Sequence, residues 1–128
     1  MRTWITNGLV VNPGMESLHA QILVEEDRIT DLPIGDFQAA PGDQIIDASG
    51  MIVIPGMIDI HIHGANNFDT MDATAEALQN MALFNVRCGV TSFLPTTVAA
   101  SQEDTIKAIE AVRDVKHSKS GAQVLVIG

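Results

Sequence analysis

The sequence predicts an α/β fold in two parts, and two observations lead to this prediction. Residues 1–54 consist of short apolar runs between turn residues, a pattern typical of a small β-sheet or half of a β-sandwich. From Pro55 onward the order becomes strand, helix, strand, helix, strand. Strands separated by helices of about 10 to 15 residues indicate parallel βαβ units. We therefore expect a boundary near Pro55, with residues 1–54 and 55–128 as separate domains.

The first part contains apolar runs that end at turn or charged residues. We expect strands at residues 9–11, 18–24, 28–32, 44–47 and 51–54. Glu26-Asp27 lies between two of these runs and is typical of a hairpin tip. The pattern favours an ordinary antiparallel subdomain that carries no chemistry of its own.

The second part alternates strand and helix patterns. We expect strands at residues 57–63, 90–94 and 123–128, and helices at residues 74–88 and after a capping box that begins at Ser101. Gly89 stands where a helix C-terminal glycine belongs, and Ile106, Ile109 and Val112 form one apolar stripe on the second helix. The nearly continuous apolar strands favour a sheet that is buried on both faces.

Composition limits the classes of function. The chain has 128 residues, 46% of them apolar and 18% charged, which is typical of a globular domain. A formal charge of −9 argues against binding to nucleic acid or to an anionic membrane surface. No apolar run approaches the roughly 20 residues of a membrane helix. We expect a soluble cytoplasmic protein in which the single Cys88 is buried and reduced.

The stretch PGMIDIHIHG, residues 55–64, carries the candidate chemistry. Side chains two residues apart on a strand leave the same face, so Asp59, His61 and His63 would share one side of the strand. Two imidazoles on one face can bind one metal ion, and the carboxyl end of a parallel strand is where α/β active sites are built. Asp59 could orient an imidazole or a loop by accepting a hydrogen bond.

A simpler reading of the histidine pair stays open, because two histidines on a strand can form nothing more than a polar face. Two histidines also do not complete a metal site. His19 and His117 have no candidate ligand near them in the sequence, so we interpret both as structural or solvated.

Longer segments around the histidines carry a resemblance. IDASGMIVIPGMIDIHIHG resembles the opening of the amidohydrolase superfamily, in which a small β-sandwich leads through a Pro-Gly turn into the first strand of a (β/α)8 barrel. HGANNFDTMDAT and GVTSFLPTTVAAS are similar to the N-acetylglucosamine-6-phosphate deacetylase family. The resemblance covers nearly the whole chain. It implies the N-terminal part of a β-sandwich followed by the first β-α-β-α-β of an amidohydrolase barrel.

The resemblance also implies a function. His61 and His63 would bind the more buried metal of a centre with one or two divalent ions, zinc or iron being expected. A glutamate ligand, two histidines and an aspartate general acid and base are expected beyond Gly128. The implied reaction is hydrolysis of the acetamide of N-acetylglucosamine 6-phosphate to glucosamine 6-phosphate and acetate, by a homodimer when the chain is full length. The isolated chain would be inactive.

Two alternatives remain open. One is a cyclic-amide hydrolase of the dihydroorotase or hydantoinase type, although those enzymes tend to carry a basic or aromatic residue where this chain has Gly64-Ala65-Asn66. The other is a truncated, non-catalytic metal-binding module. An apolar strand at residues 123–128 would form an exposed sheet edge, which proteins normally cover. We therefore expect the chain to be the start of a longer protein.

Overall fold

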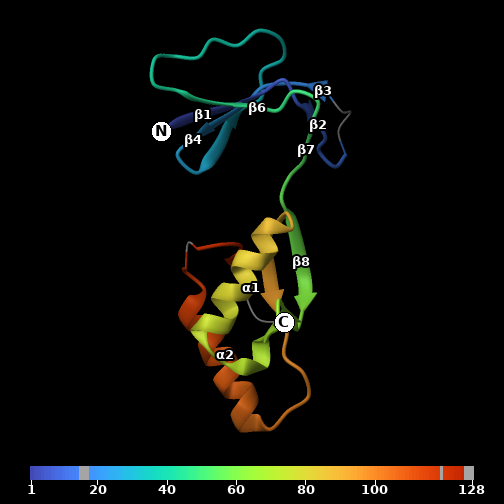
Figure 1. Cartoon of the computed structure of the whole chain (residues 1–128), viewed down its shortest axis with the longest axis vertical. Helices are drawn as coiled ribbons and strands as arrows, with labels where there is room; N and C mark the ends of the chain where they lie inside the picture. Colours follow the sequence, from blue (N-terminus) through green and yellow to red (C-terminus); the bar gives the residue numbers. More distant parts are fainter. Residues whose placement is uncertain (15–17, 119, 126–128) are drawn as a thin grey trace. The chain divides into compact units, whose positions relative to one another are not determined.

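The computed structural model describes residues 1–14, 18–118 and 120–125 (Figure 1). The chain divides into two compact units, Met1–Pro55 and Gly56–Gly128. The last three residues of the strand predicted at 123–128 lie outside the described residues.

Short strands build the first unit. In chain order they are β1 Arg2–Thr6, β2 Leu9–Val10, β3 Leu18–His19, β4 Ile22–Glu25, β5 Arg28–Asp31, β6 Gln44–Asp47 and β7 Ile52–Val53. They form one sheet in the order β5-β4-β1-β6 and another in the order β3-β2-β7. The predicted hairpin tip is confirmed, because β4 and β5 pair antiparallel on either side of Glu26, whose φ is 58°.

Two features of the first unit differ from the prediction. The sheets are mixed rather than antiparallel, since β1 pairs parallel with β6 and β2 pairs parallel with β7. β1 was not predicted at all. The direction of the β1–β6 pairing was not predictable, because it joins segments about 40 residues apart, such as Thr3 with Gln44, and a local apolar pattern carries no information on such a pairing.

Asp43 ties the end of a loop to the core of the first unit. Its carboxylate accepts hydrogen bonds from the Ala40 amide, at 2.8 Å, and from Nε1 of the buried Trp4, at 2.9 Å. The Ala40 amide, Trp4 and the nearby Arg2 together hold the pKa of Asp43 below its ordinary value. This carboxylate therefore fixes the loop that leads into β6.

The second unit alternates strands and helices. Its elements are β8 Met57–Ile62, β9 Gly64–Ala65, β10 Phe68–Asp69, the 3-10 helix η1 Thr70–Asp72, α1 Ala75–Arg87, β11 Val90–Pro95, α2 Gln102–Val115 and β12 Gln123–Val124. β8, β11 and β12 form a sheet in the order β12-β11-β8, and both pairs are parallel. The predicted order of strands and helices and the parallel pairing are confirmed for the described residues.

Capping side chains set where both helices begin. The Thr74 hydroxyl accepts a hydrogen bond from the Ala77 amide at 3.1 Å, and the Ser101 hydroxyl accepts one from the Asp104 amide at 3.1 Å. At the end of α1, Gly89 takes a φ of +83°, which favours glycine. The structure thus confirms the predicted helix start at Ser101, in its N-cap hydrogen bond, and the predicted helix-ending glycine at Gly89.

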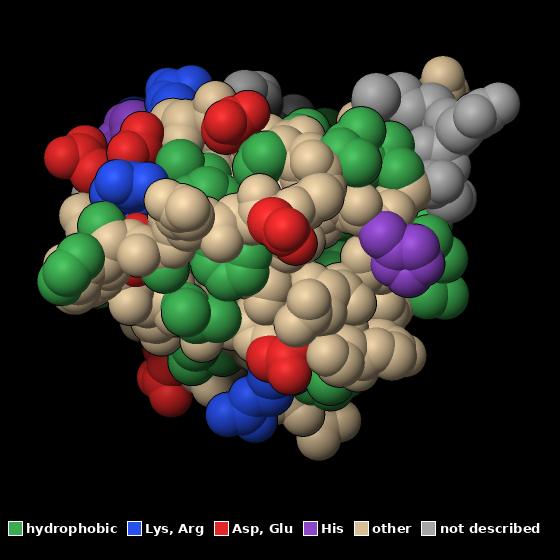
Figure 2. All heavy atoms as spheres, turned by 90° about the horizontal axis from the view of Figure 1, so that it is seen from above, with side chains coloured by type: hydrophobic (Ala, Val, Ile, Leu, Met, Phe, Trp, Pro, Cys, Tyr) green, Lys and Arg blue, Asp and Glu red, His purple; other side chains and the backbone are tan. Residues whose placement is uncertain are grey.

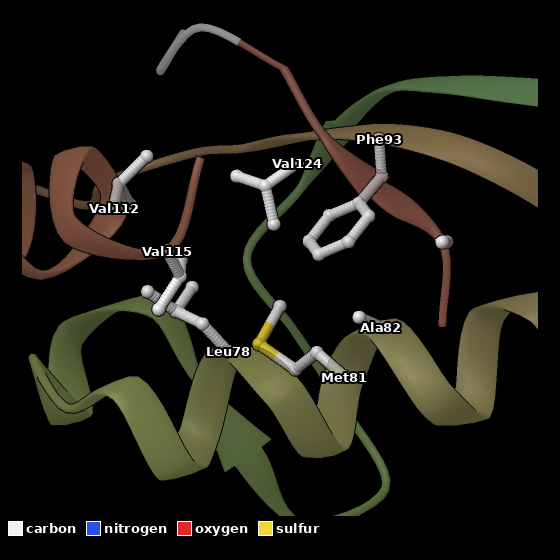
Figure 3. Packing of buried hydrophobic residues seen from close by; sticks show 8 residues of the cluster. Leu78, Met81, Ala82, Phe93, Val112, Val115 and Val124 are labelled. Atoms are coloured by element: carbon white, nitrogen blue, oxygen red, sulfur yellow. The ribbon is translucent and has the colours of Figure 1, made fainter. Parts of the chain in front are cut away.

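The core of the second unit lies between the helices and the sheet. Figure 3 shows side chains from α1, β11, α2 and β12 pointing toward one another. The buried cluster consists of Leu78, Met81, Ala82, Phe93, Val112, Val115, Ala122 and Val124. Burial of these side chains stabilises the unit by about 25 cal/mol per Å² of apolar area removed from water. Because Phe93 on β11 is fully buried, β11 is the best-anchored strand of the sheet.

Burial on α2 does not follow the whole apolar stripe, and the burial predicted for Cys88 is wrong. On α2, Val112 is buried but Ile106 and Ile109 are 46% and 42% exposed, because the helix packs through a neighbouring face that contains Ala108 and Val115. Cys88 is exposed, since it caps the end of α1 beyond the last packed turn.

β8 is also not buried on both faces. Ile58 and Ile60 are 60% and 72% exposed, while Ile62 packs against the core cluster. In the described part of the chain β8 has a strand neighbour on one side only, which is β11. The exposed isoleucines therefore belong to an edge strand.

None of the described helices is long and apolar enough to cross a membrane. On the face drawn in Figure 2, basic side chains lie at separate places among acidic and apolar ones. This distribution agrees with the formal charge of −9.

Gly121→Ala should destabilise the second unit strongly. Gly121 has a φ of +83°, and a Cβ there would lie 2.6 Å from the Ala82 carbonyl carbon. The Ala82 backbone cannot move away, because the Ala122 amide donates a hydrogen bond to the Ala82 carbonyl oxygen. Gly89→Ala is the matched control, since its φ is also +83° but its Cβ would meet only the flexible end of Met57.

The control should cost about 1 to 2 kcal/mol for the backbone conformation, and Gly121→Ala about 1 to 3 kcal/mol more for the overpacking. Chemical denaturation followed by circular dichroism measures both values. Equal losses for the two variants would contradict the packing described at Gly121.

Candidate metal centre

The carboxyl end of β8 brings two imidazoles together. His61 lies in the strand and His63 follows its last residue, Ile62. Nε2 of His61 lies 3.2 Å from Nε2 of His63, the ring centroids are 4.9 Å apart, and the ring planes are at 88°. The structure therefore places the two predicted ligand side chains on the same side of the chain with their outer nitrogens converging.

This separation fits two ligands of one ion. Imidazole nitrogens bind Zn²⁺ at roughly 2.0 to 2.1 Å, and two of them at a tetrahedral angle lie about 3.3 Å apart. The observed 3.2 Å between the Nε2 atoms is close to this value. The nitrogen donors also suit zinc, iron and several other divalent metals, so the donor set does not select among them.

A backbone carbonyl from the neighbouring strand holds one of the rings. Nδ1 of His63 lies 3.0 Å from the carbonyl oxygen of Thr96, the residue that follows β11. The Thr96 amide in turn donates to the Ile62 carbonyl at 2.8 Å. A ligating histidine usually donates its second ring N–H to such an acceptor, which fixes the orientation of the ring.

Asp59 contacts the backbone of the pair rather than a ring. Its Oδ1 accepts a hydrogen bond from the His61 amide at 3.0 Å. This contact constrains the backbone of the strand at His61 and involves neither imidazole ring. The predicted part of Asp59 in orienting an imidazole or a loop stays a prediction, and the backbone contact is the one that the structure records.

A tight loop follows the histidines. β9 and β10 pair antiparallel as a hairpin, and its two-residue turn consists of Asn66 and Asn67, whose φ values are 54° and 64°. Gly64 has to be glycine here, because a Cβ would collide with the Phe68 carbonyl oxygen. The Thr70 amide then donates to the His63 carbonyl at 2.7 Å, so the loop returns to the candidate centre.

A capping box closes the loop. The Asp69 side chain accepts from the Met71 amide at 2.8 Å, and Asp72 Oδ2 accepts from the Asp69 amide at 2.8 Å. A shallow hollow of about 500 Å³ lies on this loop, and its walls are residues Gly64, Ala65, Asn66, Asn67, Phe68, Asp69 and Asp72. Next to the candidate centre in sequence, the chain therefore forms a concave, mostly polar surface.

The described residues supply two candidate ligands, not a complete site. Among residues 1–14, 18–118 and 120–125, no group of three or more His, Cys, Asp or Glu side chains is arranged to hold a metal ion. His19 and His117 are exposed. Sequence reasoning missed the two backbone partners of His63, the Thr96 carbonyl and the Thr70 amide, because backbone groups leave no residue-type signal.

Parallel βαβ units with paired histidines at the carboxyl end of the first strand define an α/β protein with a candidate metal centre. Residues 52–126 match the amidohydrolase family. This match covers more than half of the chain, and the chain therefore belongs to the amidohydrolase family.

Individual relatives agree with this assignment. The N-acetylglucosamine-6-phosphate deacetylase of Lysinibacillus sphaericus is 35% identical over 97 residues, which is 76% of this chain and 24% of that protein. The dihydroorotase of Bacillus licheniformis is 36% identical over 77 residues, 57% of this chain and 18% of that protein. The chain thus spans a quarter or less of the length of these relatives.

A solved structure shows the same fold over nearly the whole chain. The N-acetylglucosamine-6-phosphate deacetylase from Pasteurella multocida superposes with a TM-score of 0.82 and 25% identity. The superposition covers 95% of this chain and 32% of that one. Both units of the chain therefore have counterparts in a structure about three times as long.

Asp69→Ala should loosen the loop at the candidate centre. The change removes the carboxylate that caps η1, and loss of such a cap costs about 1 kcal/mol. Thermal unfolding should show this loss, and hydrogen exchange at the Thr70 amide should become faster. Asp114→Ala is the matched control, because the exposed pair of Asp114 with Arg113 contributes little. Unchanged exchange at Thr70 in the Asp69 variant would contradict the capping role.

Proposed function

We propose that the chain is the N-terminal part of a metal-dependent deacetylase that hydrolyses the acetamide of N-acetylglucosamine 6-phosphate. The observation that carries the proposal is the convergence of the His61 and His63 Nε2 atoms at 3.2 Å, at the carboxyl end of a parallel strand. The 35% identity to a deacetylase with that substrate in its name supports the substrate class.

The residues of this chain would hold a divalent metal and fix its position. His61 and His63 provide the two nitrogen ligands, and the Thr96 carbonyl holds the His63 ring. The chemistry that a divalent metal supplies when bound is Lewis-acid polarisation of a carbonyl oxygen and a lower pKa of bound water. In the hydrolysis, water adds to the acetamide carbonyl and the carbon–nitrogen bond breaks, giving acetate and glucosamine 6-phosphate.

The rest of the site has to come from residues outside the described ones, because the described residues hold no third ligand beside the pair. On this proposal the whole protein completes the (β/α)8 barrel and the β-sandwich begun by residues 55–128 and 1–54. It contributes the remaining ligands and the aspartate that protonates the leaving amine. One or two ions of zinc or iron, a homodimer and a cytoplasmic location remain predictions for the whole protein.

A cyclic-amide hydrolase is the second candidate, and the 36% identity to a dihydroorotase favours it. The loop after the histidines argues against it, since Gly64-Ala65-Asn66 offers no basic or aromatic side chain there. The two candidates share the histidine pair and differ in substrate. A substrate test therefore separates them, whereas a metal assay does not.

Replacing the histidines should remove one metal position. In the whole protein, His61→Ala and His63→Ala should each lower the metal content by the ion that the pair binds, because one imidazole alone is a weak ligand. Elemental analysis after purification measures the metal-to-protein ratio. His117→Ala is the matched control, since that histidine is exposed after α2. Unchanged stoichiometry in both ligand variants would reject the metal role.

The substrate assignment is tested with the protein encoded by the whole coding sequence that contains this chain. We expect acetate release from N-acetylglucosamine 6-phosphate and no turnover of dihydroorotate. Loss of a residue that hydrogen-bonds to a metal ligand lowers activity about 10- to 100-fold. Because His63 would itself be a ligand, His63→Ala should lower kcat/KM by more than that. Turnover of dihydroorotate alone would establish the second candidate. A protein that binds metal but hydrolyses neither compound would match a non-catalytic module.

A further inference from the structure

The Thr96 carbonyl determines where the proton of His63 lies. A carbonyl oxygen can only accept a hydrogen bond, so the 3.0 Å contact requires that Nδ1 of His63 carries the hydrogen. A neutral imidazole carries one ring proton. Nε2 of His63 therefore holds a free lone pair, which is the form that a metal needs.

The contact between the two rings then assigns the proton of His61. Nε2 of His63 is an acceptor, and Nε2 of His61 lies 3.2 Å from it. As a hydrogen bond between two neutral rings, this contact has His61 donating from Nε2 and keeping its lone pair on Nδ1. In that hydrogen-bonded form, the nitrogen of His61 that points at its partner carries the proton and cannot bind a metal.

We propose that the two histidines play unequal parts: Thr96 is a positioning residue that presets His63 for a metal, whereas His61 takes part only after its proton moves from Nε2 to Nδ1. Solvent exchanges this proton, since His61 is exposed, and the ring keeps one proton throughout. The part of the inference that concerns metal binding, the proton shift at His61, rests on the proposed metal role of the pair. The tautomers of the metal-free chain do not depend on that role.

Neighbouring contacts explain why His63 is the fixed ring. Thr96 is only 7% exposed, and its amide donates to the Ile62 carbonyl at 2.8 Å. The Thr96 hydroxyl donates to the Leu94 carbonyl at 3.2 Å, which fixes the turn after β11. On the other side, the Thr70 amide donates to the His63 carbonyl at 2.7 Å. The backbone and the ring of His63 are thus both anchored.

The first test reads the tautomers directly. The chain is labelled with ¹⁵N-histidine, and ring nitrogen shifts are recorded without metal at a pH where both rings are neutral. We expect His63 in the Nδ1–H form and His61 in the Nε2–H form. Adding Zn²⁺ should move His61 to the Nδ1–H form and leave the tautomer of His63 unchanged. An Nε2–H form at His63 in the metal-free chain would overturn the proposal.

The second test locks each ring in turn, with Zn²⁺ as the probe in a titration followed by NMR. His63→Nδ1-methylhistidine removes the hydrogen bond to Thr96 and should weaken zinc binding about tenfold, although its Nε2 lone pair remains available. His61→Nδ1-methylhistidine is the matched variant. It forces the lone pair onto Nε2, so it should tighten binding severalfold. The opposite order of the two affinities would overturn the unequal roles.

The two tests also separate this inference from the proposed function. If Zn²⁺ perturbs neither ring of the unmodified chain, the metal role fails and the proton shift at His61 falls with it. If Zn²⁺ binds both rings but His63 is found as the Nε2–H form before metal is added, the metal role stands and the presetting by Thr96 is wrong.

Discussion

The parallel pairing of β8 with β11 is the constraint on which the candidate centre depends. The pairing aligns Ile62 with Pro95, and the Thr96 amide continues it by donating to the Ile62 carbonyl at 2.8 Å. Because the strands run in the same direction, His63 and Thr96 emerge at the same edge of the sheet. An antiparallel neighbour would have placed the start of a strand there, without this carbonyl.

The two strands contribute unequally to the rigidity of the centre. β11 is the middle strand and carries Phe93, which is fully buried among side chains of both helices and β12. β8 is an edge strand in the described part of the chain, with Ile60 exposed. The hydrogen bond from His63 to the Thr96 carbonyl therefore connects a candidate ligand at the end of the less supported strand to the better supported strand.

Much of the fold and half of the site could be predicted from local sequence patterns. The alternation of side chains along β8 predicts that His61 and His63 share a side. This alternation belongs to any extended strand and does not depend on which strand pairs with it. The helices were predictable for the same reason, since Ser101 and Gly89 act on the backbone next to them. The parallel order of β8, β11 and β12 follows from the lengths of the helices between them.

Features that depend on distant partners were out of reach. The parallel pairing of β1 with β6 joins segments about 40 residues apart. The exposure of Ile106 and Ile109 depends on which face of α2 meets the core, and apolar spacing alone does not determine that face. The contact of Thr96 with His63 uses a backbone oxygen, which every residue type has. Its position could be located only after the strands were paired.

On the proposed function, His61 and His63 bind one divalent ion through their Nε2 atoms. X-ray absorption at the zinc edge, on the chain loaded with one equivalent of Zn²⁺, tests it most directly. We expect imidazole scattering with nitrogen at roughly 2.0 to 2.1 Å, and loss of that signal when both histidines are replaced by alanine. An unchanged zinc spectrum in the double variant would contradict the claim.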